Sequence, residues 1–257
     1  MQPAYDEIAY SELTLWRYKM LQSPSLLNRM AQKMQHKINN ILPEKVHQVI
    51  TATIKQMIRA TLFGAEKTTR QPFVYAGLEQ KEAVVRDRIE FYKKTAAAEG
   101  GVTGAGGFLL GLADFPLLLG LKIKMLFEIA AIYGYSVEDY RERIYLLYIF
   151  QLAFSSQEQR RQVYLQMINW EKQKQNLPSD IHQFDWRTFQ QEYRDYIDLA
   201  KMAQLVPIIG APVGAVVNYR LLNKLGRFAM NAYRMRLQDQ IQNAPLNPGS
   251  PTNLPAA

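Results

Sequence analysis

The chain of 257 residues contains no cysteine. This absence excludes disulfide bonds, thiolate zinc sites and cysteine nucleophiles, and it is typical of proteins in a reducing compartment. The chain has only three histidines, His36, His47 and His182, and none of them lies at a metal-ligand spacing from another. The sequence therefore predicts neither a metal site nor a bound cofactor.

A secretory signal and a clear membrane-spanning run are also missing. The N-terminal stretch MQPAYDEIAYSELTLW carries acids and no apolar core, so we expect no signal peptide there. Residues 202–219 are uncharged, but Pro207 and Pro212 interrupt them. A spanning helix needs about twenty apolar residues in succession. These features favour a folded protein with an internal apolar core, to which the 48% of apolar residues would contribute.

Positive charge is concentrated in one region. Between Arg17 and Arg70 there are ten lysines and arginines and two acids, which accounts for the whole net charge of +8. Such a region predicts an anionic partner, either an anionic lipid surface or an acidic protein, although a solvated basic face is the simpler alternative. No platform of stacking aromatic residues accompanies it, so nucleic acid is not expected. The candidate contacts to an anionic surface are Arg29, Lys33, Lys37, Lys45, Lys55 and Arg59.

Apolar residues recur with helical periodicity along most of the chain, and no pair of strands is evident. The pattern predicts an all-α fold, a multi-helix bundle formed by a single domain over 1–240 and followed by a disordered tail, 241–257. Within the basic region, Pro24 and Pro43 delimit two amphipathic helices. Further helices are expected over 79–98, 115–133, 137–170 with a break at Ser155 and Ser156, 188–205 and 211–238, with a linker over 178–186.

Residues 99–120 hold seven of the fourteen glycines. Gly100, Gly104, Gly107 and Gly111 are spaced so that they form one stripe without side chains on a helix, which would let a second helix approach closely. The stretch lacks the third glycine of a dinucleotide loop and the lysine of a P-loop, so phosphate binding is not favoured. We therefore predict a glycine-rich apolar helical hairpin, buried in protein in preference to a membrane.

The turn of this hairpin and a second break share a start signal. Asp114 is placed to cap the helix that begins at Phe115, with Pro116 in its first turn. At the second break, Gly210 precedes the last helix, and Pro212 and Gly214 lie at its start. The candidate polar site consists of Asp114, Lys124, Glu128, Asn218, Arg220 and Asn223.

Two further expectations concern charged side chains. Lys124 and Glu128 have the i, i+4 spacing of an ion pair on one helix face. Arg234 and Arg236 lie near the end of the last helix, where a basic end would suit the helix dipole.

Two long stretches resemble the EcsC family. GGVTGAGGFLLGLADFPLLLG and the residues after it, within 99–156, are similar to the family's central signature. AQLVPIIGAPVGAVVNYRLLNKLGRFAMNAYRMR, within 203–236, is similar to its closing segment. The resemblance covers about a third of the chain. It implies a bacterial protein whose family is named after an operon that also encodes an ABC exporter, and it carries over no catalytic residue.

Three hypotheses for function follow. The first is a non-enzymatic helical accessory protein at the cytoplasmic membrane face, linked to an anionic surface or to a membrane transporter such as an ABC exporter. The second is a soluble interaction module whose basic helices bind an acidic protein. The third is an enzyme that uses a buried carboxylate, Asp114 or Glu128.

Overall fold

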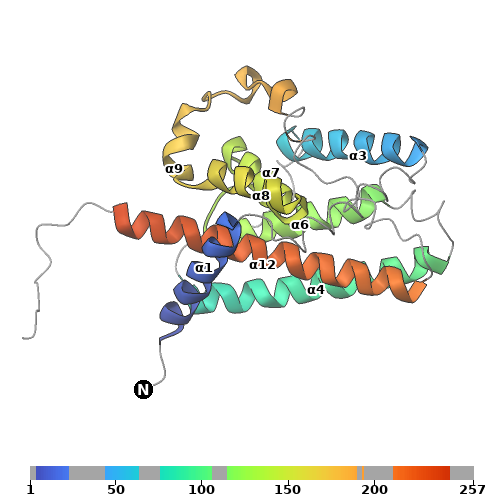
Figure 1. The fold of residues 1–257 in the computed structure, drawn as a ribbon, viewed down its shortest axis with the longest axis horizontal. Helices are drawn as coiled ribbons and strands as arrows, with labels where there is room; N and C mark the ends of the chain where they lie inside the picture. The colour runs from blue at the N-terminus through green and yellow to red at the C-terminus, as the bar shows by residue number, and fades with distance from the viewer. Residues whose placement is uncertain are drawn as a thin grey trace, which may run out of the picture.

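The structure is a computed structural model that describes residues 4–22, 44–63, 76–105, 115–189, 193 and 211–243. Every regular element in these ranges is a helix, so the predicted all-α fold is confirmed (Figure 1). The α-helices are α1 (Tyr5–Leu21), α3 (Glu44–Phe63), α4 (Leu78–Ala105), α6 (Phe115–Tyr133), α7 (Tyr140–Phe154), α8 (Gln157–Met167), α9 (Trp170–Gln173) and α12 (Ala211–Asn243). Two 3-10 turns, η2 (Lys174–Asn176) and η3 (Ile181–Gln183), follow α9.

The centre of the molecule is the pair formed by α12 and α4, which lie side by side over most of their length (Figure 1). Helices α1, α6 and α7 also pack against α12, so this last helix contacts most of the fold. At Gly226 the two central helices approach so closely that a Cβ atom would lie 2.5 Å from Ile89 Cδ1. A side chain at this position would therefore force the Ile89 side chain to move.

Helices α4 and α6 form an antiparallel pair. Lys81 near the start of α4 reaches the end of α6, where its Nζ donates to the carbonyl oxygen of Tyr133 at 3.1 Å. Further along α4, the Tyr92 hydroxyl donates to Glu128 at 2.8 Å. Helix α4 ends at Ala105, beyond the predicted residue 98, so it contains Gly100 and Gly104. Gly107, Gly111 and Asp114 lie outside the described residues, and the packing of the glycine stripe stays a prediction.

Several helix ends lie where the sequence placed them. Helix α6 begins at Phe115 and ends at Tyr133, and Gly134 follows in the left-handed conformation with φ 99°. Ser155 caps the end of α7 and Ser156 caps the start of α8, where its side chain accepts from the backbone N–H of Gln159. Short polar side chains and a glycine therefore end these helices by the expected local chemistry.

Other helices have bounds that match or differ from the expected ones, and some expected helices fall outside the described residues. Helix α3 matches the second amphipathic segment and buries Ile50, Ile54 and Ile58. Helix α1 was not among the helices expected from the sequence, and α12 continues to Asn243, five residues past its expected end. The first basic amphipathic helix, most of residues 188–205 and the tail from 244 onward lie outside the described residues.

Candidate functional site

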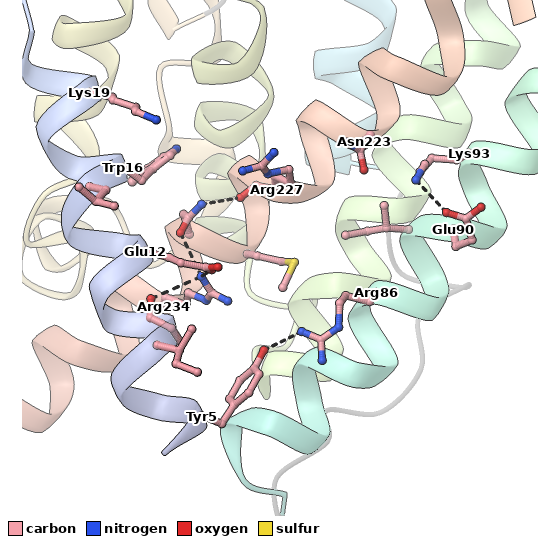
Figure 2. Close-up of a pocket in the computed structure, with 16 residues that line it drawn as sticks. Tyr5, Glu12, Trp16, Lys19, Arg86, Glu90, Lys93, Asn223, Arg227 and Arg234 are labelled. Atoms are coloured by element: carbon pink, nitrogen blue, oxygen red, sulfur yellow. Dashed lines mark hydrogen bonds and ion pairs between the residues drawn. The ribbon is translucent and has the colours of Figure 1, made fainter. Parts of the chain in front are cut away.

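A cavity of about 600 Å³ lies between α1, α4 and α12 (Figure 2). Its volume is within the range of about 300–1,000 Å³ that is typical of small-molecule sites. Charged and polar side chains from all three helices line it: Tyr5, Glu12, Lys19, Arg86, Glu90, Lys93, Asn223, Arg227, Asn231 and Arg234. Apolar side chains complete the wall: Ile8, Ala9, Leu15, Trp16, Ile89 and Met230.

Arg234, which lines this cavity, forms an ion pair with Glu82 behind it. Arg234 Nε and one of its terminal nitrogens donate to the two oxygens of Glu82, each at 2.6 Å, and Glu82 is fully buried. The other terminal nitrogen of Arg234 donates to Glu12 at 2.8 Å. Burial disfavours the guanidinium charge, but the hydrogen bonds to Glu82 and Glu12 outweigh it and hold the pKa of Arg234 above its ordinary value.

Tyrosine hydroxyls complete the hydrogen bonding of Glu82. Tyr133 of α6 donates to Glu82 at 2.9 Å, and Tyr5 of α1 donates to its other oxygen. The Tyr5 hydroxyl in turn accepts from Arg86 at 2.6 Å (Figure 2). Burial and the neighbouring carboxylate raise the pKa of both phenols, so they remain hydrogen-bond donors at neutral pH.

A second buried cluster surrounds Arg236, two residues further along α12. Arg236 donates to Glu142 of α7 at 2.6 Å and to Glu171 of α9 at 2.5 Å. Its guanidinium carbon lies 3.8 Å from the ring centroid of Tyr135 and 4.6 Å from that of Tyr145. Although burial opposes the charge, Glu142 raises the pKa of Arg236, which therefore remains a cation inside the core.

These two clusters correct the expectation for the end of α12. Arg234 and Arg236 are 4% and 1% exposed, so they do not form a solvated basic end. The helix continues past them to Asn243, and their partners lie on α4 and α7. Both arginines are buried because each meets a buried glutamate in the tertiary fold.

One lysine is fully buried without a carboxylate in hydrogen-bond range in the described part of the chain. Lys122 of α6 is 0% exposed, and its Nζ donates to the carbonyl oxygen of Leu118 at 3.2 Å. Burial lowers the pKa of Lys122 to about 7, and the charge of Glu99 opposes this effect only in part. Lys122 therefore titrates near neutral pH.

A second, more apolar groove of about 360 Å³ lies between α3 and α6. It is lined by Thr53, Gln56, Met57, Ala60, Thr61, Pro116, Leu119, Gly120, Ile123, Lys124 and Phe127. None of these side chains is acidic. Lys124 lines the groove and is exposed on α6, whereas Lys55 and Arg59 are exposed on a different side of α3 and do not line it. The groove is thus mostly apolar, with one basic side chain in its lining.

The residues of the candidate polar site lie in different parts of the structure. Lys124 lines the groove between α3 and α6, whereas Glu128 faces α4, where it accepts from Tyr92 and lies 3.8 Å from Arg88. The expected ion pair between Lys124 and Glu128 is not among the contacts of these two described residues.

The remaining members of that candidate site belong to α12 or lie outside the described ranges. Asn218 is buried, Arg220 is exposed, and Asn223 lines the cavity of Figure 2. Asp114 and Gly210 lie outside the described residues. Pro116 is the second residue of α6.

Of the candidate basic contacts, Lys55 and Arg59 are exposed on α3. Lys45 belongs to the first turn of that helix, and Arg29, Lys33 and Lys37 lie outside the described residues. Pro212 and Gly214 belong to the first turn of α12.

Sequence reasoning missed Glu82, Glu142 and Lys122. Glu82 belongs to a helix half that is rich in charge, so its sequence context does not distinguish it from exposed neighbours. For Lys122 a signal existed, because it follows the apolar run FPLLLGL within a helix of high overall hydropathy. A lysine inside such a helix indicates either a buried cation or a boundary between surfaces.

The comparisons with known proteins agree with the two signature stretches. The model of the EcsC protein family matches residues 7–237. The chain belongs to the EcsC family. It is 42% identical over 233 residues to the protein EcsC of Bacillus subtilis (strain 168), and the match covers 90% of this chain and 96% of that protein. The resemblance inferred from the sequence is therefore confirmed.

A second relative matches over a shorter range. The uncharacterized protein YdbA of Bacillus subtilis (strain 168) is 32% identical over 143 residues, which are 55% of this chain and 52% of YdbA. No solved structure matches the chain. In the described ranges, none of the helices combines the length and the apolar character needed to cross a bilayer.

Proposed function

We propose that this EcsC family member is a non-enzymatic accessory protein that binds the cytoplasmic face of the cell membrane through the surface of α3 and α6. The observations that support the proposal are the apolar groove between these helices, which Lys124 lines, and the exposed cations Lys55 and Arg59 elsewhere on the surface of α3. The lining of the groove contains no acid, and Glu44 is the only acid of α3. Basic side chains beside an apolar surface are typical of proteins that bind anionic lipid.

Exposed apolar residues adjoin the same groove. Phe63, two residues after the lining residue Thr61, is 40% exposed, and Leu117, next to Pro116, is 55% exposed. Each lysine or arginine close to an anionic bilayer contributes about 1 kcal/mol to binding. The cytoplasmic leaflet is anionic, so this surface favours that side of the membrane. A membrane transporter in the same bilayer, such as an ABC exporter, is the partner that this location favours.

Vesicle flotation tests the proposal directly. We expect the full chain to float with vesicles of phosphatidylglycerol and phosphatidylcholine at low salt, to bind pure phosphatidylcholine weakly, and to lose binding at high salt. The double substitution Lys55→Gln and Arg59→Gln removes two exposed cations and is expected to weaken partitioning about tenfold to thirtyfold.

A matched control is the double substitution Arg161→Gln and Lys172→Gln. It removes the same charge from exposed positions on α8 and α9, and we expect it to leave partitioning nearly unchanged. Equal losses in both variants would show that only net charge matters and would refute a specific surface on α3. Failure of the wild-type chain to bind anionic vesicles at low salt would refute the membrane proposal and leave the basic surface to an acidic protein partner.

A further inference from the structure

The cavity between α1, α4 and α12 has one end where hydrogen-bond donors predominate. Lys19 of α1 and Arg227 of α12 line this end, and in Figure 2 the Lys19 side chain points from α1 toward the helix that carries Arg227. In the described part of the chain neither side chain has an ion-pair partner. The indole N–H of Trp16, on the same side of the cavity, is buried and lacks an acceptor in the described ranges.

The other cations of the cavity are already paired. Lys93 Nζ donates to Glu90 at 2.7 Å, and Arg234 is bound by Glu82 and Glu12 as described above. Arg86 donates to the hydroxyl of Tyr5 and lies 3.8 Å from Glu82. The positive charge that remains for a ligand therefore belongs to Lys19 and Arg227.

Apolar side chains continue the wall next to these two cations. Leu15 is one helical turn before Lys19 on α1, and Met230 is one turn after Arg227 on α12. Leu15 is 61% exposed, although it borders a cavity. Glu12 lies two turns before Lys19 on α1, between Lys19 and Tyr5, and its 62% exposed side chain is paired with Arg234 at 2.8 Å (Figure 2). The cavity thus offers at one end two cations that are unpaired among the described residues, with apolar side chains next to them.

We propose that this cavity binds a small organic oxyanion, a carboxylate or phosphate with an apolar part. Its charged end lies between Lys19 and Arg227, where ammonium and guanidinium groups donate charge-assisted hydrogen bonds to the oxygens. Its apolar part packs against Leu15 and Met230. The site is formed by α1, α4 and α12 and does not involve the basic surface of α3.

Calorimetric titration of the full chain with octyl phosphate, octanoate and octylammonium, each below its micelle concentration, tests the proposal. We expect saturable binding of the two anions and much weaker binding of the cation of the same length. The double substitution Lys19→Gln and Arg227→Gln is expected to weaken anion binding about tenfold or more. The control Arg161→Gln with Lys172→Gln removes the same charge elsewhere and is expected to keep the wild-type affinity.

A second variant tests the apolar wall. Leu15→Glu changes an exposed side chain, so the fold is retained, and it places an acid one turn from Lys19. We expect it to abolish binding of octanoate, whereas Leu165→Glu on the exposed surface of α8 is expected to have no effect. Far-UV circular dichroism of each variant confirms that it is folded.

Three results would overturn the proposal: no saturable binding of either anion by the wild type, equal binding of octylammonium, or equal affinity in the Lys19 and Arg227 double variant. Adding phosphatidic acid vesicles to the full chain with octyl phosphate bound identifies the source of the ligand. Displacement of octyl phosphate from the wild-type chain assigns the site to a lipid headgroup. Retention of octyl phosphate assigns it to a soluble molecule, and in both cases the oxyanion site is supported.

Discussion

Replacing Lys122 by methionine is expected to stabilise the protein, and to do so in a pH-dependent way. Methionine has a similar length and no charge, so it fills the same buried volume on α6 without the cost of an ammonium group in the core. The hydrogen bond from Nζ to the carbonyl oxygen of Leu118 is lost. Because that carbonyl belongs to the same helix, it keeps its backbone hydrogen bond.

The size of the effect follows from the pKa of Lys122, which burial lowers from 10.5 to about 7. Each tenfold change in proton affinity is worth about 1.4 kcal/mol, so the depression corresponds to about 5 kcal/mol at most. Below pH 7 the lysine is charged in both states and the folded state bears the full cost. Between pH 7 and 10.5 the unfolded chain binds the extra proton, so stability rises with pH. The advantage of Lys122→Met is therefore largest below pH 7 and shrinks as the pH approaches 10.5.

Urea unfolding followed by circular dichroism at several pH values between 6 and 10 measures this difference. Lys124→Met is the matched control, because Lys124 lies two residues away on the same helix and is exposed. We expect this control to show no pH-dependent gain over the wild type. A stability difference between Lys122→Met and the wild type that stays constant from pH 6 to 10 would refute the reasoning, and so would a loss of stability at pH 6.

Two further predictions concern the packing of α12. Glu142→Gln leaves the buried charge of Arg236 only partly compensated and is expected to lower the free energy of unfolding by about 3–5 kcal/mol. The double substitution Glu142→Leu and Arg236→Met is expected to cost less than the sum of Glu142→Leu alone and Arg236→Met alone. Additive costs in chemical denaturation would contradict this. Gly226→Val places a side chain against Ile89 and is expected to cost about 1–3 kcal/mol. Ile89→Ala in the same chain is expected to recover part of that loss, and no recovery in thermal unfolding would contradict the close contact.

The sequence predicted those parts of the fold that depend on local chemistry. Gly134 ends α6 because a left-handed residue follows the helix there, and two adjacent serines cap the end of α7 and the start of α8. The stripe of isoleucines in α3 was equally readable, because a helix that packs on one side shows its period in the sequence. These features require only neighbours within a few residues.

The charged interior was not predictable in the same way. Arg234 and Glu82 are 152 residues apart in the chain, and Arg236 and Glu142 are 94 apart, so no local pattern connects them. Arg234 and Arg236 were expected to form a basic helix end because of their position in the sequence. Their contacts with α4 and α7 instead bury both side chains. Glu128 illustrates the same limit, because its contacts, Tyr92 and Arg88, come from α4 and not from its own helix.

The position of the two arginines on the last helix has a consequence for the order of synthesis. Glu82 and Glu142 leave the ribosome long before α12, so the nascent chain contains two carboxylates whose buried partners do not yet exist. We expect the preceding helices to remain loosely packed until α12 emerges, since an unpaired carboxylate in a core is costly. Chains released before residue 236 are therefore expected to be degraded instead of accumulating as partly folded forms.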